Sequence, residues 1–168
     1  RRSMTPPSAA LADERAEHDP VEVTRGEYVV STDKRRIDVK AVHAFLASSY
    51  WSPDIPESVV RRAIAGSICF GIYRGTEQVG FARVISDCAT YAYLSDVFVL
   101  EAHRGRGLAT LMMEVVMAHP SLQGLRRFSL STRDAHALYR QFGFDAVANP
   151  DRQLEILRRD MYRQPRAE

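Results

Sequence analysis

The chain has 168 residues and a formal net charge of +2, with 45% hydrophobic and 26% charged residues. This length is enough for one domain with its own core, and the balanced charge gives no reason to expect a nucleic-acid partner. Cys69 and Cys88 show neither metal-ligand nor disulfide-framework spacing, so we expect reduced thiols and a cytoplasmic protein. No long apolar run is present, so we expect no membrane span.

Residues 1–25 mix proline, alanine and charge without a period, and they predict a disordered tail before a single domain of residues 26–168. Residues 1–3 precede Met4, and we interpret them as a remnant of an expression tag. No apolar stretch follows Arg1 and Arg2, so the N-terminus is not typical of a secretory signal.

Hydrophobic periodicity, turn residues and helix caps predict the remaining elements in chain order. We expect a strand at 27–31, a helix that begins after Asp38 and ends near 48–51, and a second helix at 57–65. Strands at 67–73, 78–85 and 91–99 should follow, and then a helix from 107 to 119. The last expected elements are a strand at 125–131, a helix from its cap at Asp134 to 143, and a closing hairpin of strands at 144–147 and 154–157.

This order of elements, β-αα-βββ-α-β-α-ββ, predicts the fold class. Helices interrupt the strands, so we expect an α/β or α+β fold in which helices cover both faces of a mixed, mainly antiparallel twisted sheet. Both alternating faces of 91–99 carry apolar residues, which is typical of a central strand covered on both sides.

The segment 104–109, Arg-Gly-Arg-Gly-Leu-Ala, leads from the expected strand at 91–99 into a helix. Glycines let the backbone approach an anion, and the unpaired amides of a first helical turn favour phosphate. The Gly-Lys-Ser/Thr run of a P-loop is not present, and Thr110 stands where a dinucleotide fingerprint needs its third glycine. A solvated basic turn that caps a helix is the alternative without a ligand.

The remaining pattern, Arg/Gln-x-x-Gly-x-Gly/Ala, is met by Arg104, Gly107 and Ala109. It resembles the pyrophosphate loop of the GCN5-related N-acetyltransferases, the GNAT family, which bind acetyl-coenzyme A. Val97 to Val99, just upstream, resembles the strand-four signature of that family. The segment 134–144 resembles its helix-four motif, Ala-x-x-Leu-Tyr-x-x-x-Gly-Phe.

The resemblance extends over about 27–161, and it is strongest over 78–144. It implies the same sheet architecture as the element order, and an acetyl-CoA-dependent N-acetyltransferase without a metal. The implied cofactor contacts come from the strand and from the loop: Val97, Phe98, Val99, Arg104, Gly105, Arg106, Gly107, Leu108, Ala109 and Thr110.

Within this set the resemblance implies different tasks. The amides of Gly105, Gly107 and Ala109 would face the pyrophosphate, whereas Leu108 would anchor the helix in the core. Arg106 either reaches a phosphate or faces water. In the family the pantetheine arm pairs with strand four like an extra strand, so the Val99 amide would polarise the thioester carbonyl.

Tyr139 matches the tyrosine of the helix-four motif, which makes it the expected general acid for the leaving thiolate. A phenol with an ordinary pKa near 10 suits that task. The alternative is an aromatic side chain that only packs against the sheet.

The general base is not evident, because Tyr93 and Ser95 stand where family members often carry Glu or His. Strand alternation places Tyr93, Ser95, Val97 and Val99 on one face and Asp96 on the other, but a bulge would turn Asp96 toward the site. Ser95 and Asp96 remain candidates, directly or through water. So does His136, one helical turn before Tyr139. A structural carboxylate at 96 and an ordinary surface histidine at 136 are the alternatives.

In the family, acceptor selection usually involves the first helix pair and its loop, so the resemblance implies an acceptor site there and near the end of the strand at 91–99. The candidate acceptor-binding residues are Tyr50, Trp51, Asp54, Tyr93 and Thr132. An aromatic pair can wall a pocket for an apolar acceptor, and Asp54 can attract an ammonium group. Trp51 as a core anchor is the alternative.

We therefore expect direct transfer of an acetyl group to the primary amine of a small molecule, without an acyl-enzyme. A protein lysine or N-terminal acetyltransferase is the second hypothesis, and it needs an open acceptor groove. A CoA-binding module without catalysis is the third. Many relatives form homodimers, but no interface can be identified from the sequence.

Overall fold

The computed structural model describes residues 19–163, and a six-stranded sheet forms its centre. The strands follow each other across the sheet in chain order: β1 (Glu22–Arg25), β2 (Tyr28–Ser31), β3 (Ile68–Arg74), β4 (Glu77–Ser86), β5 (Tyr91–Val99) and β6 (Arg127–Leu130). Neighbours pair antiparallel except β5 and β6, which are parallel. The predicted mixed, mainly antiparallel sheet is confirmed.

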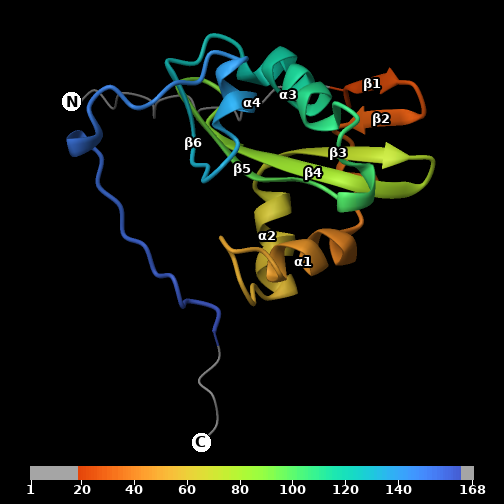
Figure 1. Ribbon diagram of the computed structural model, residues 1–168, viewed down its shortest axis with the longest axis horizontal. Coiled ribbons are helices and arrows are strands. Elements are labelled where there is room, and N and C mark those ends of the chain that lie inside the picture. The colour runs from red at the N-terminus through yellow and green to blue at the C-terminus, as the bar shows by residue number, and fades with distance from the viewer. Residues whose placement is uncertain (1–18, 164–168) are drawn as a thin grey trace, which may run out of the picture.

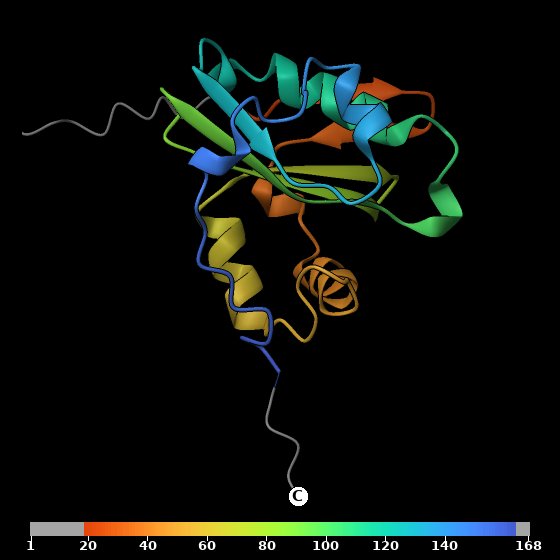
Figure 2. The ribbon, with the colours of Figure 1, turned by 60° about the vertical axis from the view of Figure 1, so that its left-hand side comes forward.

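Helices cover both faces of the sheet, as Figure 1 and the turned view in Figure 2 show. On one face lie α3 (Leu108–Ala118) and the short α4 (His136–Arg140), and on the other lie α1 (Val39–Ala47) and α2 (Glu57–Ala65). Each face has its own hydrophobic core. The layered α+β fold class predicted from the element order is therefore confirmed.

The caps of α1 and α4 differ in how well the sequence predicted them. Asp38 caps α1 as expected, because its carboxylate accepts a hydrogen bond from the Ala41 amide at 3.1 Å. The prediction that Asp134 caps α4 is wrong. The hydroxyl of Thr132 accepts from the Ala135 amide at 3.0 Å, and the helix begins one residue later.

Both ends of the predicted strand order need correction. β1 lies inside the range 1–25 where we expected a tail, while residues 1–18 lie outside the described residues. The closing hairpin at 144–147 and 154–157 is wrong, because neither segment forms a strand. Leu154 and Ile156 are 96% and 87% exposed, so the apolar side chains of this segment do not pack against the sheet.

A β-bulge at Asp96 overturns the expected alternation along β5. Arg83 pairs with Ser95 but Phe81 pairs with Phe98, so two residues of β5 stand opposite one residue of β4. Asp96 has a φ of 56°, in the left-handed region. Arg83 hydrogen-bonds to both Ser95 and Asp96, so these two side chains share a face.

Val97 and Val99 pack instead into the core beneath α3. The prediction that they share a face with Ser95 is therefore wrong, and a bulge does turn Asp96 toward the side of α1 and α2. A one-residue insertion reverses every side chain that follows it.

A substitution at Gly80, on β4, measures how tightly β4 packs against its neighbours in the sheet. A Cβ added there would lie 2.8 Å from the Ile72 Cδ1 atom and 3.0 Å from the Phe98 carbonyl oxygen. We expect Gly80→Ala to lower the free energy of unfolding by about 1–3 kcal/mol in urea unfolding, because the backbone oxygen cannot turn away. Gly66→Ala, whose nearest atom would be 3.5 Å away, is the control and should stay within ~0.5 kcal/mol. Equal unfolding midpoints would contradict this packing.

Candidate active site

The strands β5 and β6 are paired along only part of their length. Tyr91 to Leu94 pair with Arg127 to Leu130, and within the described residues no strand pairs with β5 on that side beyond Leu94. The main chain of β5 from Ser95 to Val99 is therefore open to an extended ligand, which can add to a sheet as a strand does. Val97, Phe98 and Val99, three of the expected cofactor contacts, lie in this stretch.

The glycine-rich loop adopts the backbone that an anion site needs. Gly105 and Gly107 have φ values of 74° and 73°, in the left-handed region that glycine tolerates best. Gly107 is the N-cap of α3, and the first helical bond runs from the Leu111 amide to the Gly107 carbonyl. The amides of Leu108, Ala109 and Thr110 therefore have no acceptor within the helix and carry the positive end of its dipole.

A hollow of about 120 Å³ lies over this helix start. Its lining combines the end of β5 with the loop and the first turn of α3: Val99, His103, Arg104, Gly105, Gly107, Leu108, Ala109 and Thr110. Seven of these eight residues are among the cofactor contacts that the sequence predicted, and the structure brings them together. Leu108 is also buried in the core, as expected for the residue that anchors the helix.

His103 is the lining residue that sequence analysis missed. It is buried, and its Nδ1 atom lies 2.9 Å from the Tyr28 hydroxyl. Its position directly before Arg104 is visible in the sequence, but its burial depends on β2. Arg104 has a structural contact of its own, because its Nε donates to the Val99 carbonyl at 2.9 Å. This bond ties the loop to the end of β5.

Tyr139 lies on α4 and is only 8% exposed. Burial raises the pKa of its phenol to about 12, and the nearby Tyr50 and Asp134 act in the same direction. The proton therefore stays on this hydroxyl at neutral pH. Tyr50, in the expected acceptor loop, is thus close enough to Tyr139 to act on the charge of its phenol.

The acceptor loop carries two exposed aromatic residues. Tyr50 and Trp51 are 54% and 41% exposed, and their rings meet edge to face with centroids 5.0 Å apart. Arg133, from the segment before α4, places its guanidinium carbon 4.0 Å from the centroid of the Tyr50 ring. The loop after α1 and the segment before α4, which are distant in sequence, thus meet at Tyr50.

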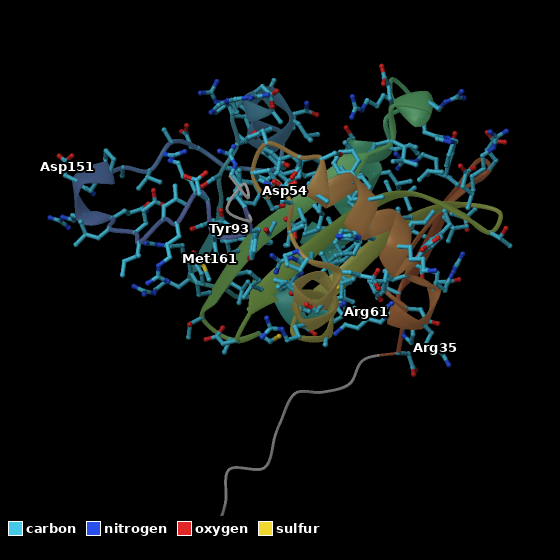
Figure 3. All side chains as sticks on the ribbon, turned by 90° about the horizontal axis from the view of Figure 1, so that it is seen from below. Arg35, Asp54, Arg61, Tyr93, Asp151 and Met161 are labelled. Atoms are coloured by element: carbon cyan, nitrogen blue, oxygen red, sulfur yellow. The ribbon has the colours of Figure 1, made fainter. Side chains whose placement is uncertain are left out.

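The other predicted site residues differ in how far they are buried. Figure 3 views the sheet from the side of α1 and α2, with Tyr93 on β5 and Asp54 in the loop after α1 labelled. Asp54 is exposed and Tyr93 half-buried. Thr132 is half-buried and accepts a hydrogen bond from the Ala135 amide just before α4, and His136 is exposed at the first position of that helix.

Asp96 has both carboxylate oxygens engaged. Oδ2 accepts from the Arg83 Nε at 2.5 Å, and Oδ1 accepts from the Trp51 indole nitrogen at 3.0 Å. The Asp96 side chain is 7% exposed. This arrangement favours the structural interpretation of Asp96 over that of a free base. Ser95 accepts a long hydrogen bond from the same guanidinium, at 3.4 Å.

Comparison with known proteins identifies the family. Residues 65–146 match the family described as an acetyltransferase (GNAT) domain. A candidate acetyltransferase of Gibberella zeae is 38% identical over 139 residues, which cover 69% of this chain and 77% of that protein. A crystal structure from Xanthomonas campestris, described as belonging to the GNAT family, is 48% identical with a TM-score of 0.81, and the match covers 84% of this chain and all of that one. The chain belongs to the GNAT family.

The protein is thus an acyltransferase of the acetyl-CoA-dependent type, and the resemblance found in the sequence is confirmed. A more distant structural relative, from Clostridium acetobutylicum, is an acetyltransferase described with acetyl-CoA. It is 17% identical with a TM-score of 0.58, and the match covers 77% of this chain and 94% of that one. Within residues 19–163, no helix is long and apolar enough to cross a membrane, and no cluster of three or more His, Cys, Asp or Glu side chains could hold a metal ion.

The raised pKa of Tyr139 predicts a loss of stability at alkaline pH. Below pH 10 the phenol is neutral in both the folded and the unfolded chain, so it leaves the free energy of unfolding unchanged. Between pH 10 and about 12 the unfolded chain releases the proton while the folded chain keeps it, so the free energy of unfolding falls. We expect Tyr139→Phe to reduce this fall by about 1–3 kcal/mol in urea unfolding at a series of pH values.

Tyr91→Phe is the control, because Tyr91 is exposed on the same sheet, and it should follow the unaltered protein. A parallel decline of stability in the Tyr139→Phe variant and the unaltered protein would contradict the burial of the Tyr139 hydroxyl.

Proposed function

We propose that this GNAT enzyme transfers an acetyl group from acetyl-CoA directly to the primary amine of a small molecule. The observation that carries the proposal is the position of a buried, protonated Tyr139 beside the exposed aromatic pair Tyr50 and Trp51. An acid for the leaving group thus stands next to a surface that can hold an apolar acceptor.

The cofactor would be held mainly by main-chain groups. The unpaired amides at the start of α3 suit a pyrophosphate, and the left-handed glycines keep Cβ atoms out of its way. The open main chain of β5 from Ser95 to Val99 suits an extended pantetheine arm. The Val99 amide would then donate to the thioester oxygen and stabilise the negative charge that develops there.

In the transfer step, the neutral amine nitrogen attacks the thioester carbonyl carbon. The new carbon–nitrogen bond forms as the carbon–sulfur bond breaks, and the sulfur takes a proton from the Tyr139 hydroxyl. The amine loses one proton to water, because Arg83 and Trp51 already engage both carboxylate oxygens of Asp96. That proton balances the one that Tyr139 regains from solvent.

The role of Tyr139 as the acid predicts a kinetic effect without a binding effect. We expect Tyr139→Phe to lower kcat by about 10²–10⁴-fold, measured as release of free CoA thiol, because the thiolate then leaves without a proton donor. The Kd of acetyl-CoA in calorimetry should stay within about twofold, because the phenyl ring keeps the packing.

Arg140→Ala is the matched control on the same helix, and because Arg140 is exposed and has no assigned role it should keep the unaltered kcat. Full activity in Tyr139→Phe would remove the acid role. A thioester that is never consumed by any amine, despite tight binding of acetyl-CoA, would instead favour a CoA-binding module.

The loop at Gly107 predicts a binding effect. We expect Gly107→Glu to weaken acetyl-CoA binding by at least 100-fold in calorimetry, because a carboxylate then stands at the helix start where the pyrophosphate should lie. Gly124→Glu is the matched control. Gly124 also has a left-handed φ, of 69°, and open space around its Cα, but it does not line the hollow. Equal weakening in both variants would point to backbone strain rather than to a phosphate site.

A further inference from the structure

The carboxylate of Asp96 is the most heavily engaged charged group next to the acceptor loop. Its backbone is in the left-handed region, which is uncommon for a residue other than glycine and persists where the surroundings hold it. The bulge turns the side chain toward α1 and α2, where it borders a small cavity of about 10 Å³ lined mainly by apolar side chains. A carboxylate in such a place needs compensating partners.

Arg83 provides the positive charge that pairs with the Asp96 carboxylate, and Trp51 donates a hydrogen bond to its other oxygen. The Asp96 and Arg83 side chains are 7% and 16% exposed, so their ion pair is largely removed from solvent. The same guanidinium reaches the Ser67 hydroxyl at 3.3 Å, which ties it to the start of β3. The second oxygen of Asp96 receives the indole N–H across 45 residues of sequence. The indole of the acceptor loop is thus bonded to the bulge of β5.

A second contact joins the same loop to the same strand. The Phe45 ring stacks on Phe98, with centroids 3.9 Å apart and an interplanar angle of 11°, and it meets the Trp51 ring at a centroid distance of 6.2 Å. Trp51 is therefore connected to β5 through Asp96 on one side and through Phe45 and Phe98 on the other. The residue between these two points is Val97, whose main chain is open on the β6 side.

We propose that Asp96 is a positioning residue that fixes the acceptor wall, Trp51, to the segment of β5 that receives the acetyl donor. This inference rests on the proposed function and deepens it. The buried ion pair Asp96–Arg83 stabilises the bulge, and Asp96 in the bulge accepts the hydrogen bond of the Trp51 indole. The side chain that would contact the amine and the segment of β5 that would bind the thioester therefore keep a fixed relative position. Asp96 therefore acts through Trp51, and it takes no proton in the reaction.

The chain offers a direct optical test, because Trp51 is its only tryptophan. In Asp96→Asn the side-chain amide loses the charge that pairs with Arg83, which should release the loop. We expect the indole emission to shift to longer wavelength and acrylamide quenching to increase. Glu57→Gln removes another carboxylate–arginine pair, the exposed Glu57–Arg61 pair of α2, and it should leave emission and activity unchanged.

Kinetics then separate positioning from plain structural support, with 2-phenylethylamine as the probe amine. We expect Asp96→Asn and Trp51→Phe each to raise the KM for the amine about tenfold, while the Kd of acetyl-CoA changes less than twofold. Trp51→Phe keeps an aromatic ring and leaves the Asp96–Arg83 pair intact, so it carries the test if Asp96→Asn does not fold.

Unchanged emission and quenching in a folded Asp96→Asn variant would overturn the proposal, and so would an unchanged amine KM in Trp51→Phe. Equal loss of amine and acetyl-CoA binding would also overturn it, because that pattern means general disruption of the fold. If the unaltered protein acetylates no amine, the proposed function fails, while the emission of Asp96→Asn still decides whether Asp96 holds the indole.

Discussion

The bulge at Asp96 is the constraint on which the arrangement of this site depends. One extra residue in β5 reverses the alternation of side chains, so Asp96 and Phe98 face α1 and α2 while Val97 and Val99 face α3. Without that reversal, an acidic side chain would not meet Arg83, and the valines would not complete the core beneath α3. Successive side chains of a strand point to opposite faces of the sheet, so a shift of one residue moves every following side chain to the other face. No intermediate register exists that would place some of these side chains correctly on both faces.

The start of α3 and the surroundings of Tyr139 have opposite effects on charge. The hollow at the start of α3 offers main-chain amides and a helix dipole, which favour an anion without any salt bridge. Tyr139 lies in a buried position where charge is disfavoured, so its phenol keeps its proton. α3 and α4 thus bring an environment that favours an anion and one that disfavours charge to the same face of the sheet.

The cofactor side and the acceptor side also differ in the kind of atoms that they present. In the proposed site, backbone groups of β5 and of the glycine-rich loop would contact the cofactor, and residues of many types can supply such groups. On the proposed acceptor side, side chains would make the contacts, namely Tyr50, Trp51 and Arg133. The GNAT fold is shared with structural relatives of only 14–22% identity, which is consistent with a framework carried by main-chain geometry. Selectivity for an amine would then reside in the loops around α1 and α4.

The sequence by itself determined the features that depend on local spacing. The glycines at 105 and 107 predict a turn before α3 in which the backbone can approach an anion, the cap at Asp38 predicts the start of α1, and the motif around Tyr139 places a tyrosine on α4. Each rests on residues a few positions apart, whose hydrogen bonds and periods can be identified without knowledge of the fold. The family and the fold class follow from the same short-range patterns.

Only the tertiary structure decided the features that depend on distant partners. β1 is too short to show a period and exists because β2 pairs with it, whereas the segments at 144–147 and 154–157 have the right pattern but no pairing strand. The raised pKa of Tyr139 comes from burial, and the bond from Trp51 to Asp96 spans 45 residues. Burial and long-range pairing are properties of the packed chain, because they depend on which surfaces meet after the local elements have formed.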